Sequence, residues 1–422
     1  MSNLSVFKKN VLRVCLLAVA VFVSTALALA GDLAFVGKCD KDPLSYEPGE
    51  EMVFSITLTE DGQPVSGKNL VWTRRGDDGK SESGEAVSSA DEPLVIKTSL
   101  STPGFVHILV RVKDDNGNPI HSDPNEFNGG AGVLLDQIQG FPEPDDFDAF
   151  WARQKERLAE VPVKAELKQV DSPNDKVNVW DVRIDCVGTP VSGYLCVPKD
   201  AAPGSLPIKV FYHGYGVGSA GKYADPNFIA LDVNAHSIEN GREAAYYENL
   251  RKTGYGGYGL SPQENANPET CFWNGMMLRL MRSLQYVKTL PEWNGKDLIV
   301  TGGSQGGLQC LSAAALDHDV TECIAVVPWF CNLAGAKEQG RVGSYFFPEW
   351  TPGLGYYDST NQAKRIQCKT TILAGLGDYV CPPSGQMVLY NNMTCPVRLE
   401  FMQGRTHGFS AMKDAGVFVL EK

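Results

Sequence analysis

The stretch Leu298–Gly307, LIVTGGSQGG, places a serine between glycines directly after an apolar run. The apolar residues predict a buried strand, and the Ala/Leu-rich segment Leu308–Leu316 predicts a helix after it. Gly-x-Ser-x-Gly between a strand and a helix is typical of a nucleophile elbow, a sharp turn that presents the serine hydroxyl at a sheet edge. Glycines suit such a turn because Cβ atoms there would clash with the adjacent strand and helix. We therefore predict that Ser304 is a nucleophile; a glycine-rich phosphate or packing loop is the alternative.

A serine hydroxyl is a weak nucleophile, so the predicted site needs a base. In folds built around a nucleophile elbow, the catalytic residues follow the chain order serine, acid, histidine. Only His407 lies well downstream of Ser304, in a loop after a predicted strand, and we predict that it is the base. The remaining five of the six histidines lie upstream or just after the nucleophile helix: His107, His121, His213, His236 and His318.

The orienting acid is expected after the next-to-last core strand, which we predict at Thr370–Ala374. Asp378 follows that strand at the same sheet edge as Ser304, and Pro382 and Pro383 prevent a regular continuation. We therefore predict Asp378 as the acid. The competing acids lie inside a strand, at the end of the nucleophile helix or elsewhere downstream: Asp317, Asp319, Glu322, Glu338, Glu349, Asp358 and Glu400.

Acyl transfer at such a serine needs two backbone N–H donors for the negative oxygen of the tetrahedral intermediate. One is expected from the residue after the nucleophile, Gln305. The other is expected from the loop after an early strand, here Phe211–Gly216, whose glycines let backbone approach a substrate. His213 in this loop is predicted to shape it rather than to act as a base. This chemistry requires no cofactor and no metal.

From about residue 175 onward, predicted strands alternate with predicted helices. The strands are continuously apolar, as expected for a parallel sheet covered by helices on both faces. Together with the elbow, this predicts an α/β-hydrolase fold for residues 144–422. The predicted strands are Val177–Val187, Val191–Val197, Ile208–Tyr212, Asp297–Thr301, Ile324–Val327, Thr370–Ala374 and, as the last, Val397–Met402.

Residues 31–128 predict a separate all-β domain. Short β-branched runs alternate there with turn signals, which is typical of a small immunoglobulin-like sandwich. In the run Phe105–Val112 every even position is apolar, so that face is predicted to point into the sandwich core. The glycine-rich stretch Gly129–Gly132 predicts a linker over residues 129–143. We expect the β domain to act as a spacer or packing element, because it lacks an obvious aromatic platform.

The first 30 residues have the pattern of a cleaved secretory signal. Three basic residues come before or at the start of an uncharged apolar run, Val14–Leu29, and Ala28-Leu29-Ala30 offers the small residues that a signal peptidase needs. A retained membrane anchor is the alternative. The run is short for a membrane span of about 20 residues, which favours cleavage. We therefore predict an exported protein, periplasmic or extracellular.

Composition and charge limit which ligands and partners the protein is expected to bind. The chain carries 38 Lys and Arg against 50 Asp and Glu, a net charge of −12, and loss of a basic signal makes the remainder more acidic. Such a protein repels phosphates, so we predict no nucleic-acid partner and no membrane partner after signal cleavage. The eleven cysteines show no Cys-x-x-Cys or Cys/His spacing, so no metal site is predicted. Most are expected to be small buried hydrophobes.

Several motifs together resemble the acetyl xylan esterase and cephalosporin C deacetylase family, which is carbohydrate esterase family seven. They are Gly302–Gly307, the loop Tyr212–Gly216, Gly377-Asp378 with Pro382-Pro383-Ser384, and Pro144–Trp151. The resemblance covers about residues 140–422. It implies hydrolysis of small acetyl esters on sugars or on a cephalosporin side group.

The resemblance also implies roles for individual residues. Ser304, Asp378 and His407 would form the triad, and the backbone N–H groups of Tyr215 and Gln305 would form the oxyanion hole. Where the family usually has an Arg-Gly-Gln-Gly stretch, this chain has Asp232–Ser237, which changes the acyl pocket. The segment after Phe330 is short where family members often carry an insertion for oligomer contacts. The sequence therefore leaves an oligomer open without supporting the family's hexamer.

With the resemblance, the sequence predicts a serine carboxylesterase that removes acetyl groups from acetylated sugars, xylan or xylo-oligosaccharides, through an acyl-enzyme. One alternative is a serine peptidase of the same fold, although the N-terminal region is too short for the β-propeller that such peptidases commonly carry. Another alternative is a polysaccharide-binding β domain joined to a non-catalytic hydrolase domain. A dienelactone-type hydrolase is disfavoured because its usual nucleophile is cysteine.

Overall fold

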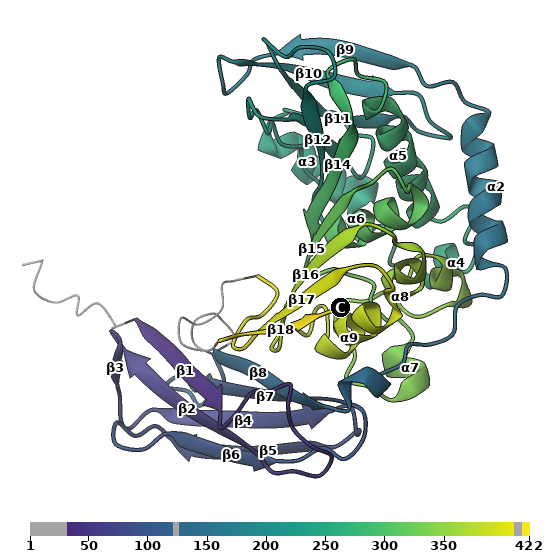
Figure 1. Ribbon diagram of the computed structural model, residues 1–422. Helices are drawn as coiled ribbons and strands as arrows, with labels where there is room; N and C mark the ends of the chain where they lie inside the picture. The colour runs from purple at the N-terminus through teal and green to yellow at the C-terminus, as the bar shows by residue number, and fades with distance from the viewer. Residues whose placement is uncertain (1–31, 121–125, 409–415) are drawn as a thin grey trace, which may run out of the picture.

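The computed structural model describes residues 32–120, 126–408 and 416–422. The N-terminal part of the chain forms a β-sandwich and the rest forms a larger α/β domain, and the two pack against each other (Figure 1). The predicted signal segment, residues 1–30, lies outside the described residues. Within the described ranges, no helix combines the length and the apolar character that a bilayer crossing requires.

The sandwich consists of two sheets with a shared apolar core. The first sheet contains β1 (Leu33–Cys39), β2 (Met52–Glu60), β3 (Gln63–Pro64) and β6 (Leu94–Thr98). The second has the order β5 (Ser81–Val87), β4 (Asn69–Gly76), β7 (Gly104–Val112) and β8 (Glu126–Val133). The even positions of β7 lie in this core, as their alternation predicts: Val106, Ile108, Val110 and Val112. The odd positions therefore point out of the sandwich.

The prediction of a linker that begins with the glycine run Gly129–Gly132 is wrong. These residues belong to strand β8 and are buried. A Cβ on Gly130 would lie 2.5 Å from the carbonyl oxygen of Val106 and 3.0 Å from that of Leu376, which belongs to the α/β domain. Gln403 of the α/β domain also accepts from the Gly130 N–H and donates to its carbonyl oxygen, both at 2.9 Å. The glycines therefore allow close packing between the domains rather than flexibility.

The α/β domain is built on a ten-stranded mixed sheet. Its central strands are parallel, whereas the first three strands in chain order and the last one are antiparallel and extend its two edges. The spatial order is β18 (Val417–Glu421), β17 (Val397–Met402), β16 (Lys369–Gly375), β15 (Glu322–Val326), β14 (Trp293–Gly303), β12 (Leu206–Tyr212), β13 (Ile229–Asn234), β11 (Val191–Pro198), β10 (Val177–Ile184) and β9 (Ala165–Val170).

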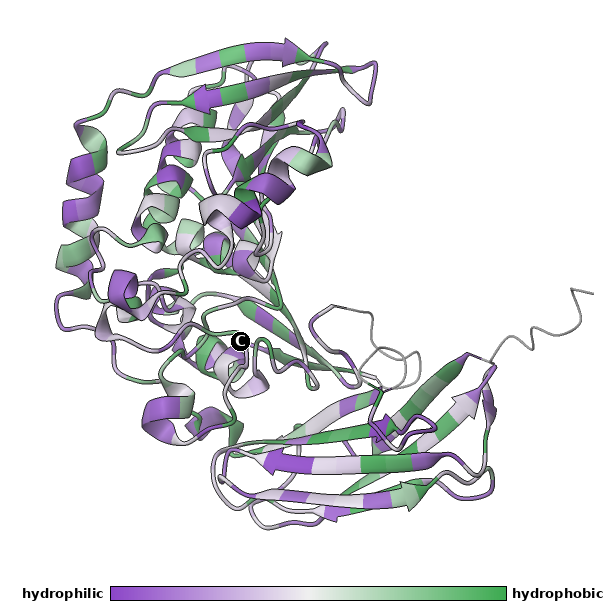
Figure 2. Ribbon diagram, turned by 180° about the vertical axis from the view of Figure 1, so that it is seen from behind, coloured by the Kyte–Doolittle hydropathy of each residue, from purple (hydrophilic) through white to green (hydrophobic). Residues whose placement is uncertain are grey.

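Helices flank this sheet, and α5 and α6 pack directly on its strands. The helices and single helical turns are η1 (Leu135–Gln137), α2 (Phe147–Ala159), α3 (Ala244–Leu250), η2 (Arg251–Tyr255), α4 (Pro262–Asn265), α5 (Phe272–Val287), α6 (Gln305–Leu316), α7 (Gly335–Gln339), η3 (Pro352–Tyr356), α8 (Ser359–Gln362), η4 (Ala363–Arg365) and α9 (Pro383–Asn392). Figure 2 shows hydrophobic residues along the strands of both domains, where the cores lie. The arrangement confirms the predicted α/β-hydrolase fold preceded by a β-sandwich.

Three strands of the large sheet, β9, β13 and β18, have no counterpart among the predicted strands. β18 also corrects the prediction that Val397–Met402 is the last strand. It is an edge strand whose residues alternate between exposed and half-buried, so its pairing with β17 is decided by the neighbouring strand rather than by an apolar run. In β13, the polar residues Asp232 and Asn234 interrupt the apolar pattern although the whole strand is buried.

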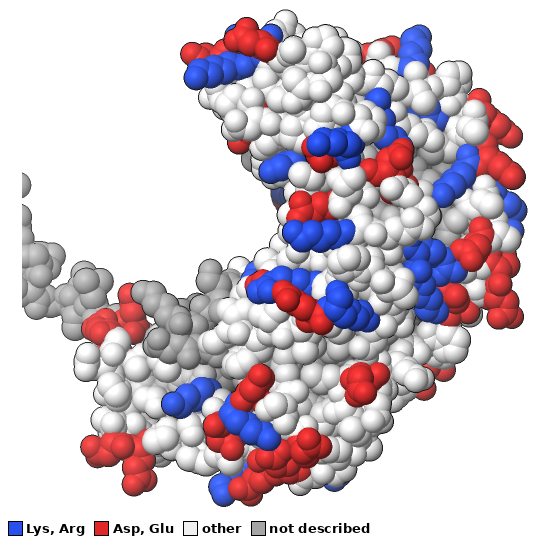
Figure 3. All heavy atoms as spheres, viewed as in Figure 1, with Lys and Arg blue, Asp and Glu red and all other residues white. Residues whose placement is uncertain are grey.

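The structure shows the state of the cysteines and the distribution of surface charge. All ten cysteines in the described ranges are free thiols and most are buried, as predicted. On the face seen in Figure 3, acidic and basic side chains are interspersed across the described residues of both domains. Mixed charges of this kind offer a polyanion no continuous basic path on that face.

The packing around Gly130 generates a stability prediction. Gly130→Ala is expected to lower the free energy of unfolding by about 1–3 kcal/mol, because the added methyl group overpacks backbone from two domains. Urea unfolding followed by tryptophan fluorescence measures this. Gly218→Ala is the matched control, because a Cβ there meets nothing within 4 Å. Equal unfolding midpoints for the two variants would contradict the packing role of Gly130.

Candidate active site

Ser304 lies at the turn between strand β14 and helix α6. Its backbone has φ 57° and ψ −118°, a conformation that residues with a Cβ rarely adopt. Its N–H donates to the carbonyl oxygen of Val326 on β15 at 2.9 Å, and its own carbonyl oxygen accepts from the N–H of Trp329 at 3.0 Å. These two bonds hold the strained turn against the neighbouring strand.

The glycines beside Ser304 are required by close packing. A Cβ on Gly302 or Gly306 would overlap the carbonyl oxygen of Tyr212 at the end of β12. A Cβ on Gly307 would lie 2.8 Å from the Cα atom of Pro328. The crowding is the kind that the sequence pattern predicts for an elbow turn, and it comes from the strands on both sides of β14.

The three residues predicted as a triad lie in direct contact. The Ser304 Oγ atom is 2.9 Å from Nε2 of His407, and Nδ1 of the same ring is 2.9 Å from Oδ2 of Asp378. With the proton on Nδ1 donating to the carboxylate, Nε2 is free to accept the hydroxyl proton of Ser304. The Asp378 side chain is 1% exposed and that of His407 25%, so the predicted base is open to solvent while the predicted acid is enclosed.

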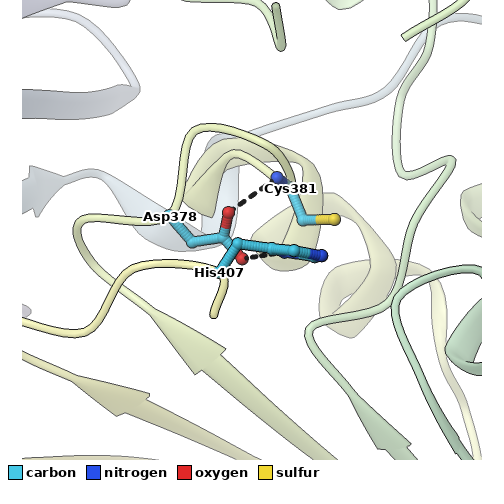
Figure 4. Close-up of side chains that lie close together, drawn as sticks. All are labelled: Asp378, Cys381 and His407. Atoms are coloured by element: carbon cyan, nitrogen blue, oxygen red, sulfur yellow. Dashed lines mark hydrogen bonds and ion pairs between the residues drawn. The ribbon is translucent and has the colours of Figure 1, made fainter. Parts of the chain in front are cut away.

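Asp378 is held in place by backbone donors. Its Oδ1 atom accepts from the N–H groups of Val380 and Cys381, each at 2.9 Å, while Oδ2 faces His407 (Figure 4). Both carboxylate oxygens therefore have donors, as a buried carboxylate requires. The turn after β16 fixes the direction in which the carboxylate meets the imidazole.

Cys381 lies beside Asp378 and His407, and these three side chains together could be taken for metal ligands (Figure 4). Burial and the neighbouring Asp378 carboxylate raise the pKa of the Cys381 thiol well above its ordinary value. A protonated thiol is a poor ligand. The Asp378 oxygens are already engaged by N–H donors. The donor set therefore fits a hydrogen-bonded triad better than a metal centre.

The loop after β12 passes over the nucleophile. A Cβ on Gly214 would lie 3.6 Å from the carbonyl oxygen of Gly303 and 3.8 Å from Cβ of Ser304. The next residue in this loop is Tyr215. Gln305 occupies the first position of helix α6, where a backbone N–H has no partner within the helix. The two predicted oxyanion donors are thus residues of the two segments that meet at Ser304.

Tyr258 ties these two segments together, and sequence reasoning did not find it. Its hydroxyl donates to Oε1 of Gln305 at 2.7 Å and accepts from the N–H of Gly216 at 3.0 Å. Its ring stacks on that of Tyr215 with centroids 4.2 Å apart and an interplanar angle of 13°. Tyr258 lies in a loop between η2 and α4, and no sequence motif marks that position.

An aromatic wall stands beside the nucleophile. The ring of Tyr215 meets Trp329 and Phe346 edge-on, each with centroids 5.4 Å apart. Trp329 is also the residue whose N–H binds the Ser304 carbonyl. No sequence motif marks Trp329 or Phe346, although Trp329 follows β15 at the carboxyl edge of the sheet, a position where site residues are common.

Comparison with known proteins identifies a family for the larger domain. The family model described as acetyl xylan esterase matches residues 135–346 and 348–418. The chain belongs to the acetyl xylan esterase family. This places it among carboxylic ester hydrolases and confirms the resemblance seen in the sequence. The match begins at residue 135, so it leaves out the β-sandwich.

Relatives of this family member include an acetyl esterase of Xylanibacter ruminicola, which is 32% identical over 275 residues, 60% of this chain. The chain spans 61% of the length of that relative. A solved acetyl xylan esterase from Paenibacillus sp. R4 is 26% identical with a TM-score of 0.55, over 65% of this chain and 94% of that one. Acetyl xylan esterase 1 from Thermoanaerobacterium sp. JW/SL YS485, at 22% identity and the same TM-score, covers 66% of this chain and 93% of its own, and shows the fold alone.

In this acetyl xylan esterase family member, the Asp232–Ser237 stretch supports the loop over the nucleophile. Asn234 donates to the carbonyl oxygen of Gly218 at 2.8 Å, and a ring nitrogen of His236 lies 3.0 Å from the carbonyl oxygen of Gly216. Asp232 accepts from a further N–H of this loop, and burial raises its pKa to about 7. Buried polar side chains of this stretch thus hold the loop after β12 in place.

The other predicted candidates lie in structural positions. Nε2 of His213 accepts from the N–H of Ala235 at 3.2 Å, a loop-shaping contact of the kind predicted. Burial lowers the pKa of the His213 imidazole below its ordinary value. Asp358 accepts from the N–H groups of Asn332 and Leu333 at 3.0 and 2.7 Å, so this buried acid serves the turn after β15.

The bridging hydroxyl of Tyr258 generates a kinetic prediction. Tyr258→Phe removes both hydrogen bonds and is expected to lower kcat on p-nitrophenyl acetate roughly tenfold with little change in KM, because the oxyanion donors lose their alignment. The control is Tyr247→Phe, whose hydroxyl also bonds two backbone groups, those of Glu239 and Arg242, and which should keep kcat. An unchanged kcat in Tyr258→Phe would contradict the positioning role.

Proposed function

We propose that this protein is a serine esterase that removes acetyl groups from acetylated sugars, xylan or xylo-oligosaccharides, through an acyl-enzyme on Ser304. The hydrogen-bonded chain from Ser304 through His407 to Asp378 carries the proposal. That chain occurs in a member of the acetyl xylan esterase family, which supports the acetyl group as the acyl part and a sugar as the alcohol part.

Acylation begins with the 2.9 Å contact between Ser304 and His407. Nε2 of His407 takes the hydroxyl proton while Oγ attacks the acetyl carbonyl carbon. The carbonyl oxygen becomes negative in the tetrahedral intermediate, and the N–H groups of Tyr215 and Gln305 stabilise it. The intermediate collapses when the C–O bond to the sugar breaks and His407 returns the proton to the leaving sugar oxygen.

Deacylation repeats these steps with water. His407 accepts a proton from a water molecule, and the resulting hydroxide adds to the acetyl carbonyl carbon on Ser304. The same two N–H groups stabilise the second tetrahedral intermediate. The bond between the acetyl carbon and Oγ then breaks as His407 protonates Oγ, acetic acid leaves and loses its proton to water, and the free hydroxyl is restored.

Asp378 orients the base throughout. Its buried carboxylate holds the imidazole with the proton on Nδ1 and stabilises the imidazolium that forms in each half-reaction. The two backbone donors on its other oxygen hold the carboxylate in position. Asp378 gains no proton in this mechanism.

A small acyl group suits the wall beside Ser304. Trp329 is anchored to the Ser304 carbonyl by its N–H, and its ring is buried against Tyr215 and Phe346. A fully buried ring cannot move aside without leaving a cavity, which is costly. We propose that this immobile wall limits the acyl group to a small one such as acetyl.

The first test measures acetate release by the purified protein from acetylated xylan and from acetylated xylo-oligosaccharides. Ser304→Ala is expected to lower the rate by about a million-fold, to the background of the assay, because the nucleophile is lost. Thermal unfolding of the variant checks that the fold is kept. Acetate release that survives in Ser304→Ala would sink the proposed mechanism.

The role of Asp378 has its own test. Asp378→Asn is expected to lower kcat on p-nitrophenyl acetate roughly 10⁴-fold, because the amide favours the wrong imidazole tautomer while the shape is kept. Asp319→Asn is the control, since that acid is an exposed partner of Lys288 at the end of the nucleophile helix. Similar activity in the two variants would assign the orienting role to another acid.

A further inference from the structure

A cavity of about 580 Å³ lies between the β-sandwich and the α/β domain, directly beside the base. On one side it is lined by His407 and Asp378, and by Tyr345 from the segment before η3. On the other side it is lined by residues of the sandwich strands β4, β7 and β8, among them Arg75 and Asn128. A volume of this size is typical of small-ligand sites.

We propose that this cavity binds the sugar part of the acetyl ester, so that the sandwich completes the substrate site. Arg75 from β4 and Tyr345 from the α/β domain are the sugar-contacting residues. The inference rests on the proposed function and assigns a task to a domain that the family match does not include.

Strand alternation turns one face of the sandwich toward the active site. Arg75 and His107 are register partners on β4 and β7, and Arg111 and Glu126 are partners on β7 and β8. These side chains leave the sheet on the face opposite to the sandwich core. Phe105, on the same face, packs into the core of the α/β domain. This polar face is therefore held against the catalytic domain.

A hydrogen-bonded chain holds this face rigid. Nδ1 of His107 lies 3.4 Å from the Arg75 guanidinium, and Nε2 lies 3.0 Å from Oδ1 of Asn128. Asn128 donates to Oε1 of Glu126 at 2.8 Å, and Arg111 donates to Oε2 of the same carboxylate at 2.8 Å. Burial lowers the pKa of His107 to about 3, so its ring is neutral and accepts from Arg75. Donors fixed in this way bind a ligand with little loss of side-chain entropy.

Arg75 has donors to spare. Its side chain is exposed, and its guanidinium lies 5.8 Å from the ring centroid of Tyr379, the residue after the predicted acid. Tyr379 also stacks on His107 with centroids 3.9 Å apart, which couples this wall to the triad. Within the described ranges, Arg75 has neutral partners and no ion pair. The guanidinium therefore keeps N–H donors for the hydroxyl and ring oxygens of a sugar.

Tyr345 supplies a flat apolar surface at the rim of the cavity. It is 79% exposed, unusual for a large aromatic ring, and such rings pack against the apolar face of a ligand while the hydroxyl stays in water. The next residue, Phe346, contacts Tyr215 of the oxyanion loop. The segment that carries Tyr345 therefore also contacts the oxyanion loop, and the cavity itself borders the active site through His407 and Asp378.

Packing alone does not account for this arrangement. An interface that only joins two domains is expected to close at native packing density, as the contact at Gly130 does. Beside His407 the same two domains leave a cavity, and its sandwich wall carries guanidinium, amide and carboxylate groups. Polar groups converging on a cavity beside a reacting centre are typical of a binding site.

The test compares two substrates in the full chain. For Arg75→Ala and for Tyr345→Ala, the ratio of kcat/KM on acetylated xylotetraose to kcat/KM on p-nitrophenyl acetate is expected to fall about tenfold, mainly through KM, because only the first substrate has a sugar. Arg75→Lys should recover part of the ratio. Lys97→Ala, an exposed cation on the other sheet of the sandwich, is the control and should leave the ratio unchanged.

The outcomes separate this inference from the proposed function. Acetate release from the oligosaccharide with an unchanged ratio in both variants would leave the esterase and overturn the cavity's role. No release by the parent protein would count against the sugar substrate. In that case calorimetry of acetylated xylotetraose with Ser304→Ala, with and without Arg75→Ala, decides the inference. Binding weakened about tenfold by Arg75→Ala supports it, and absent or equal binding overturns it.

Discussion

The strained turn at Ser304 depends on how closely three strands approach one another. The glycines before and after the serine pack against the carbonyl oxygen of Tyr212, and the turn is pinned to β15 by the Val326 carbonyl. This packing requires β12, β14 and β15 to be adjacent and parallel. Parallel strands end at a common edge, so the loops after β12, β16 and β17 all meet at the serine. The positions of Tyr215, Asp378 and His407 follow from that.

The second constraint is the shared use of strand β7. Its even positions fill the sandwich core, while Phe105 enters the core of the α/β domain. One strand therefore belongs to two cores, and the domains cannot rotate freely about a hinge between them. The close contact at Gly130 and its hydrogen bonds to Gln403 also restrict rotation between the two domains. This fixed packing of the two domains places the polar residues of β4 and β8 beside His407. A flexible linker would have left these residues in solvent.

The sequence predicted the fold class and the three side chains that lie in hydrogen-bond contact at the candidate site, because local patterns indicate them. Apolar runs mark the core strands, the glycine pattern marks the elbow, and chain order with six histidines singles out His407. The sequence did not predict three further residues at the site, because each makes its contacts with segments distant in the chain. They are Tyr258, Trp329 and Phe346. The glycine run in β8 was wrongly predicted to begin a linker. Glycine occurs both in flexible linkers and at sites of close packing, and only the neighbouring residues in the fold distinguish the two.

What the sequence determined by itself is therefore the three side chains of the candidate site: a serine at a forced turn, an acid after one strand and a histidine after the next. The backbone requirements of that turn are local, so they are visible in a few consecutive residues. The tertiary structure alone decided which residues surround these three side chains. The aromatic wall, the bridge through Tyr258 and the cavity beside the sandwich join segments separated by many residues. Their contacts depend on side-chain packing in three dimensions, which no local pattern specifies.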